Sequence, residues 1–95
     1  MTPERVVTTV SERFNVKPDA LCGKRRTKTV VLPRQVAMYL LRQLTDLSLT
    51  EIGRLFGGRD HTTVIYACDK VAELIHTDSA FGDKVNGVIS TLASG

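Results

Sequence analysis

The chain has 95 residues, 42% of them hydrophobic, and a formal net charge of +3, which suits a single domain over residues 1–95. No apolar run approaches the roughly 20 residues of a membrane span, and no basic start followed by an apolar segment indicates a signal peptide. The two cysteines are too few for a disulfide framework, which favours a reduced protein of the cytoplasm.

Positive charge is concentrated in one part of the chain. Residues 20–45 contain six Lys or Arg and no acid. A basic segment on an otherwise nearly neutral body favours a polyanionic partner, and nucleic acid is the first hypothesis.

The N-terminal residues predict two helices. Thr2 is a suitable N-cap and Pro3 suits the first helical position. Apolar residues then recur at helical spacing, at Val6, Val7, Val10 and Phe14. We therefore expect an amphipathic helix over 3–14, followed by a one-turn helix over 18–22 that Gly23 closes.

Residues 24–29 form a basic run in which four of the six residues are cationic and none is apolar. We expect an extended arm here. Such an arm can follow a phosphate backbone or enter the narrow minor groove of A·T-rich DNA. Taken alone, the run is equally typical of a solvated loop.

A long helix is expected from Pro33 to about Thr45. Its apolar residues cover most of its circumference, which predicts the central helix of the core, and they are Val36, Ala37, Met38, Leu40, Leu41 and Leu44. Among its polar exceptions, Arg34 is expected to pair with an acid at the edge of the core.

The following segment predicts a helix-turn-helix over about residues 49–76. Ser48 and Glu51 form a capping box, so a helix begins near Leu49. Gly57-Gly58 ends this helix, and Asp60 is a good N-cap for the next one. In this motif the second helix inserts its N-terminal residues into the DNA major groove.

Within the first helix of the motif, Ile52, Leu55 and Phe56 are expected to pack inward. Gly53 either permits a close approach between the two helices or is a tolerated helix glycine, which costs about 1 kcal/mol.

The second helix separates apolar from polar residues. One face carries Val64, Ala67, Cys68, Val71 and Ile75. The other carries Thr62, Tyr66, Asp69 and Glu73, with Thr63 and Lys70 at its side. The polar first turn, residues 60–63, can hydrogen-bond base edges or phosphates.

A last helix capped by Asp78 is expected to close the core. Its apolar stripe consists of Phe81, Val85, Val88, Ile89 and Leu92.

These residues carry a specific resemblance. The run Phe56-Gly57-Gly58-Arg59-Asp60-His61-Thr62-Thr63-Val64-Ile65, with Ile52-Gly53 before it and Lys70-Val71 after it, resembles the signature of the bacterial DnaA family of replication initiators. Arg34-Gln35-Val36-Ala37-Met38-Tyr39-Leu40 is also similar to the family, and the resemblance extends from residue 2 to about 92.

The resemblance implies the C-terminal DNA-binding domain of these initiators, an all-α fold of about six helices. The implied partner is double-stranded DNA, bound by a monomer at the asymmetric, A/T-rich DnaA box of the TTATNCACA type at the replication origin. No cofactor is expected in this chain, because ATP would bind a separate module, and the rest of an initiator would be a partner if this is a fragment.

Site residues follow from the same resemblance. Base readers are Arg26 in the minor groove, with Arg25 as the alternative within the basic run, and Asp60, His61 and Thr62 in the major groove. The expected phosphate contacts are Lys24, Arg25, Lys28, Gln35, Arg42, Leu49, Thr50, Arg59, Thr63 and Lys70. Arg42 is equally typical of a solvated surface charge, and family members often have proline at the position of Thr50.

Enzymatic and metal-binding interpretations are weaker. Neighbouring helical residues do not face each other, so Asp60 is poorly placed to orient His61 as a base, and Cys68 is expected to be buried. The sequence lacks a G-x-x-x-x-G-K-[ST] loop, so we expect no catalysis. We expect no metal site either, because Cys68 lies seven residues from His61 and eight from His76, against the i, i+4 spacing of helical ligands.

A small helix-turn-helix transcriptional regulator is the main alternative. Such regulators commonly dimerise on palindromes, and the sequence predicts no surplus apolar face for a dimer. The first helix mixes acids with its basic residues, which disfavours a membrane-surface role.

Overall fold

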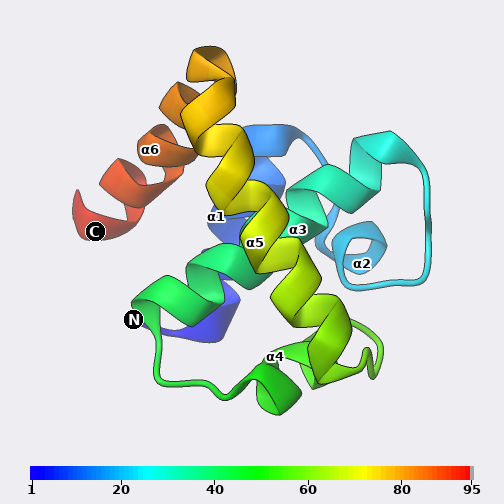
Figure 1. Cartoon of the computed structure of the whole chain (residues 1–95). Helices are drawn as coiled ribbons and strands as arrows, with labels where there is room; N and C mark the ends of the chain where they lie inside the picture. The colour runs from blue at the N-terminus through cyan, green and yellow to red at the C-terminus, as the bar shows by residue number, and fades with distance from the viewer. Residues whose placement is uncertain (95) are drawn as a thin grey trace.

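The helix at the centre of the molecule is α3 (Lys28–Leu44) (Figure 1). The structure is a computed structural model that describes residues 1–94; Gly95, the end of the expected domain, lies outside the described residues. The helices are α1 (Pro3–Phe14), α2 (Pro18–Leu21), α3 (Lys28–Leu44), α4 (Leu49–Leu55), α5 (His61–Thr77) and α6 (Ser79–Ser94). Residues 1–94 thus contain six helices and no strand, which confirms the predicted all-α fold.

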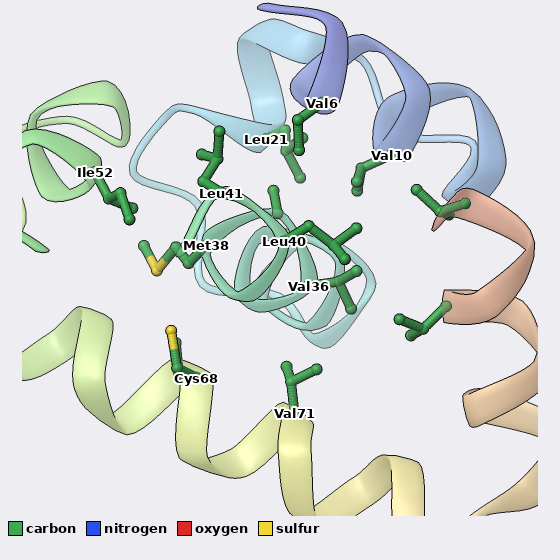
Figure 2. Close-up of a cluster of buried hydrophobic side chains, with 14 of the residues drawn as sticks. Val6, Val10, Leu21, Val36, Met38, Leu40, Leu41, Ile52, Cys68 and Val71 are labelled. Atoms are coloured by element: carbon green, nitrogen blue, oxygen red, sulfur yellow. The ribbon is translucent and has the colours of Figure 1, made fainter. Parts of the chain in front are cut away.

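Helices α1, α2, α4 and α5 pack against α3, and α6 packs against α1 and α5 and adds its own buried side chains to the core. Figure 2 shows α1, α2, α4 and α5 turning apolar side chains toward Val36, Met38, Leu40 and Leu41 of α3. These four α3 residues are at most 1% exposed. Complete burial of such a side chain stabilises the fold by about 1.5–3 kcal/mol, so α3 is the element on which the others depend.

The ends of the chain are tied together. The Thr2 hydroxyl accepts a hydrogen bond from the Arg5 amide (3.3 Å), which confirms the predicted cap of α1. The Arg5 guanidinium donates to the carbonyls of Thr91 and Leu92 at 3.4 Å each. Near the start of α6, the Asp78 carboxylate accepts from the Phe81 amide (3.1 Å), as its predicted capping role requires.

Helix α3 begins five residues earlier than predicted. Lys28 and Thr29 form its first turn, so the expected arm is wrong at its C-terminal end, and only residues 24–27 are non-helical. The sequence predicts a start at Pro33 because proline lacks an amide donor, which the first turn of a helix does not need. Inside the helix Pro33 deprives the Thr29 carbonyl of a donor and its ring crowds that carbonyl. Burial of Val30, which is 5% exposed, offsets this cost and favours the longer helix.

The prediction that Leu55 packs inward is also wrong, because its side chain is 39% exposed. The chain leaves helical geometry at Phe56 (φ −114°, ψ 46°), and Phe56 with Ile52 takes the inward space. Leu55 therefore lies beside a shallow groove of about 270 Å³ at α1 and α2. No helix within residues 1–94 has the length and apolarity needed to cross a bilayer.

Candidate nucleic-acid interface

The turn between α4 and α5 has the predicted geometry. The Ser48 hydroxyl accepts from the Glu51 amide (3.1 Å), and the Ser48 amide donates to the Glu51 carboxylate (2.9 Å), completing the capping box. Gly57 and Gly58 have φ values of 80° and 75°. A residue with a Cβ would pay about 1–2 kcal/mol in this region, so the glycine pair sets the sharp reversal that leads into α5.

Gly53 brings α4 against the start of α5. A Cβ added there would overlap the Arg59 carbonyl oxygen and lie 3.0 Å from the carbonyl carbon. The Arg59 amide in turn donates to the Gly53 carbonyl at 2.9 Å. The close-approach interpretation of Gly53 is therefore confirmed.

The first turn of α5 is open to solvent. Residues 60–63 are all exposed, with the Asp60 and His61 side chains at 69% and 60%. Asp60 caps the helix, because its Oδ1 accepts from both the amide and the hydroxyl of Thr62 at 2.7 Å. These hydrogen bonds from Thr62 lower the pKa of the Asp60 carboxyl. The carboxylate lies 3.6 Å from His61 Nδ1, longer than a hydrogen bond.

Helix α5 separates its faces as predicted. Its buried residues are Val64, Ala67, Cys68 and Val71, and Ile75 is half-buried. Thr62, Thr63, Tyr66, Asp69, Lys70 and Glu73 are exposed. Cys68 is 4% exposed, and this burial raises the pKa of its thiol. Helix α5 thus packs against the core through its apolar face, and its polar face is exposed to solvent.

Arg34 of α3 donates hydrogen bonds to α2 and to the basic arm. Its Nε donates to the Leu21 carbonyl (2.7 Å), Nη1 to the Arg25 carbonyl (2.7 Å) and Nη2 to the Ala20 carbonyl (3.1 Å). The expectation of an acidic partner is wrong, because three backbone carbonyls take its place, two at the end of α2 and one in the arm. Burial lowers the pKa of Arg34, which is only 3% exposed.

Arg59 links the arm to the helix-turn-helix. Its Nη1 donates to the carbonyls of Gly23 (3.2 Å) and Phe56. One guanidinium nitrogen of this expected phosphate contact is therefore used within the protein. Nε and Nη2 make no hydrogen bond to residues 1–94.

The arm and α5 line the same cleft, which has a volume of about 630 Å³, and Thr63 is the residue of the first turn of α5 that lines it. Lys24 and Arg26 line it from the arm, and Thr63 and Tyr66 line it from α5. In Figure 1 the loop after α2 and the N-terminal end of α5 lie on the same side. Within the described chain the lining residues include no acid and four cations, which are Lys24, Arg26, Arg34 and Arg59. The lining of the cleft is therefore positively charged.

Gln35 also lines this cleft. It is 9% exposed, and its Oε1 has no hydrogen-bond partner within residues 1–94. A buried polar atom without a partner is costly. Because Oε1 only accepts hydrogen bonds, a phosphate contact from Gln35 would have to come from the Nε2 donor of the same amide.

The remaining predicted site residues do not line this cleft, and they include the predicted base readers Asp60, His61 and Thr62. Arg25, Lys28, Arg42, Thr50 and Lys70 are exposed, and Leu49 is half-buried. The capping box uses the amides of Ser48 and Glu51, which leaves the Leu49 and Thr50 amides without a partner among residues 1–94.

Tyr66 lies on the exposed face of α5, as predicted, but is not among the predicted site residues. It is 63% exposed and lines the cleft beside Arg26 and Thr63. The feature of the sequence that could have identified this residue is a large aromatic side chain on an otherwise polar helix face.

The sequence is similar to those of known proteins. The family model described as the bacterial dnaA protein helix-turn-helix matches residues 3–71. The chain is 53% identical over 90 residues to the chromosomal replication initiator protein DnaA of Thermus thermophilus, covering 95% of this chain and 20% of that protein. The protein of the same name from Oenococcus oeni is 48% identical over 94 residues, covering 93% of this chain and 21% of that protein. For Roseiflexus castenholzii the identity is 50% over 88 residues, with 93% and 18% coverage. The chain therefore spans about a fifth of the length of these relatives.

Proposed function

The chain belongs to the bacterial DnaA family, matching its C-terminal helix-turn-helix domain, and we propose that it binds double-stranded DNA sequence-specifically at DnaA boxes of the replication origin. In this role it recruits an initiator to the origin as a monomer, in the cytoplasm at the nucleoid. ATP binding and strand opening would belong to other modules of a longer initiator, and we propose no cofactor or catalysis within this chain.

The cleft between the arm and α5 is the observation that carries the proposal. Adjacent major and minor grooves of a duplex are separated by one sugar-phosphate strand. A helix in one groove and an arm in the next must therefore straddle that strand. A cleft with Arg26 on one wall, Thr63 on the other and no acidic lining residue in the described chain suits an anionic strand.

The first turn of α5 supplies the proposed major-groove contacts. Asp60 can accept from a cytosine amino group, His61 can donate to or accept from a base edge, and Thr62 can hydrogen-bond a base or contact a thymine methyl. Each good base contact contributes about 1–3 kcal/mol of discrimination. Exposure of all three side chains makes them available to DNA.

The arm supplies the proposed minor-groove contact through Arg26. Narrow A·T-rich minor grooves have an enhanced negative potential that attracts arginine. The proposed phosphate contacts are Lys24, Arg25, Lys28, Gln35, Arg42, Leu49, Thr50, Arg59, Thr63 and Lys70.

A titration followed by fluorescence anisotropy tests the proposal. One labelled duplex carries a TTATNCACA box, and the control duplex has the same base composition in scrambled order. We expect much tighter binding to the box at physiological salt, with a 1:1 complex by analytical ultracentrifugation. Equal affinity for both duplexes would refute sequence-specific box binding. A 2:1 complex that forms only on a palindrome would favour the alternative, a dimeric transcriptional regulator.

A further inference from the structure

Arg34 is a buried cation without a carboxylate partner among residues 1–94. Buried charges are normally paired with an opposite charge. Here three nitrogens of one planar guanidinium are directed at three carbonyls, at 2.7, 2.7 and 3.1 Å. Two of the carbonyls, those of Ala20 and Leu21, belong to α2, and the third belongs to Arg25 in the arm. The side chain therefore joins α3 to two consecutive segments.

The Arg25 contact bears directly on the neighbouring residue, Arg26. A peptide group is planar, so the carbonyl of residue 25 and the amide of residue 26 lie in one rigid unit. Holding the Arg25 oxygen at 2.7 Å from Arg34 Nη1 thus restrains the backbone from which the Arg26 side chain extends. Arg34 itself is 3% exposed and has little surface to offer to DNA.

Arg59 ties the other end of the arm to the turn before α5. Its Nη1 bridges the carbonyls of Gly23, at the root of the arm, and Phe56, at the end of α4. The arm is consequently tethered to α3 by Arg34 and to the α4–α5 turn by Arg59. These tethers set the separation between the arm and the first turn of α5.

We propose that Arg34 is a positioning residue that presets the backbone of Arg26 for minor-groove contact, with Arg59 as the second tether. This inference rests on the proposed DNA-binding function. Binding with a preset arm avoids ordering that segment on the duplex, which favours affinity through preorganisation.

A double-mutant cycle between Arg34→Lys and Arg26→Ala tests the role. Lysine keeps the charge but lacks the planar fork that reaches several acceptors. We expect Arg34→Lys to weaken box binding roughly tenfold in the wild-type background and less than about twofold in the Arg26→Ala background. Additive losses within about twofold would overturn the proposal.

Arg42→Ala is the matched control on the same helix. Arg42 is exposed and is a separate proposed phosphate contact, so its loss should add to that of Arg26→Ala within about twofold. Arg13→Ala removes the same charge from the exposed surface of α1 and should leave box binding unchanged.

A measurement without DNA separates this inference from the proposed function. Amide relaxation of the free protein should give Arg26 a wild-type order parameter near the roughly 0.85 of rigid backbone, falling toward about 0.6 in Arg34→Lys, with α5 unchanged. An unchanged Arg26 order parameter would overturn the positioning role. If wild type does not prefer the box, the proposed function fails by itself.

Arg59→Lys provides a second route if Arg34→Lys does not fold, as judged by circular dichroism. Arg59 is half-buried, so its replacement is better tolerated. The same coupling to Arg26→Ala and the same loss of order are expected. Additivity together with an unchanged arm would overturn the proposal.

Discussion

Gly53→Ala should destabilise the protein, although alanine is the better helix former. At an unhindered helix position the change would stabilise by about 1 kcal/mol. Here the added methyl overlaps the Arg59 carbonyl, and relieving such overpacking costs about 1–3 kcal/mol. Separating the two backbones also weakens the 2.9 Å hydrogen bond from the Arg59 amide to Gly53, worth about 1 kcal/mol.

The net expectation is a loss of about 1–3 kcal/mol. For a domain of this size each 1 kcal/mol lowers Tm by about 4–8 °C. Thermal and urea unfolding followed by circular dichroism would measure the change. Because the displaced carbonyl immediately precedes Asp60, box affinity should fall as well.

Gly58 offers a matched control. A Cβ there meets nothing within 4 Å, and only its φ of 75° opposes substitution. Gly58→Asn should therefore cost less than Gly58→Ala, because asparagine tolerates this conformation. A Gly53→Ala protein at least as stable as wild type would refute the close-approach argument.

Three further predictions concern the proposed interface and its caps. His61→Ala should lose about 1–3 kcal/mol of binding free energy on the box and reduce discrimination between the box and scrambled DNA. Equal weakening on both duplexes would show that His61 contacts only phosphate. Six of the ten proposed phosphate contacts are Lys or Arg, so log affinity should fall with log salt at a slope near −5, and a flat response would contradict the basic interface. Hydrogen bonds hold the pKa values of Glu51 and Asp60 below their usual 4.5 and 3.8. The stability that these ionised caps contribute should be fully present above their usual pKa values and lost as pH falls through the lowered pKa values of the folded protein. A Ser48→Ala variant whose acid unfolding transition is unchanged would contradict the contribution of Glu51.

Local patterns predicted most of the fold. The capping residues Thr2, Ser48, Asp60 and Asp78 each make their expected hydrogen bond. These signals succeed because a cap is satisfied within a few residues of sequence. The exposed face of α5 was also predictable, since its periodicity needs no knowledge of distant segments.

The errors arose where tertiary contacts decide the outcome. Proline indicated a helix start at Pro33, but burial of Val30 in the core extends α3 to Lys28. Arg34 was expected to find an acid, but its partners are carbonyls 9 to 14 residues away. No local pattern shows which carbonyls a fold leaves unpaired, so the proposed positioning role emerges only in three dimensions.

Base analogues give the most direct test of two-groove binding. Inosine·cytosine has the minor-groove pattern of A·T and the major-groove pattern of G·C, because inosine lacks the 2-amino group. At box positions facing the arm, we predict that I·C binds like A·T and that G·C weakens binding in an Arg26-dependent way. At A·T positions facing α5, I·C should weaken binding as much as G·C does. The same response to I·C at both sets of positions would contradict the account.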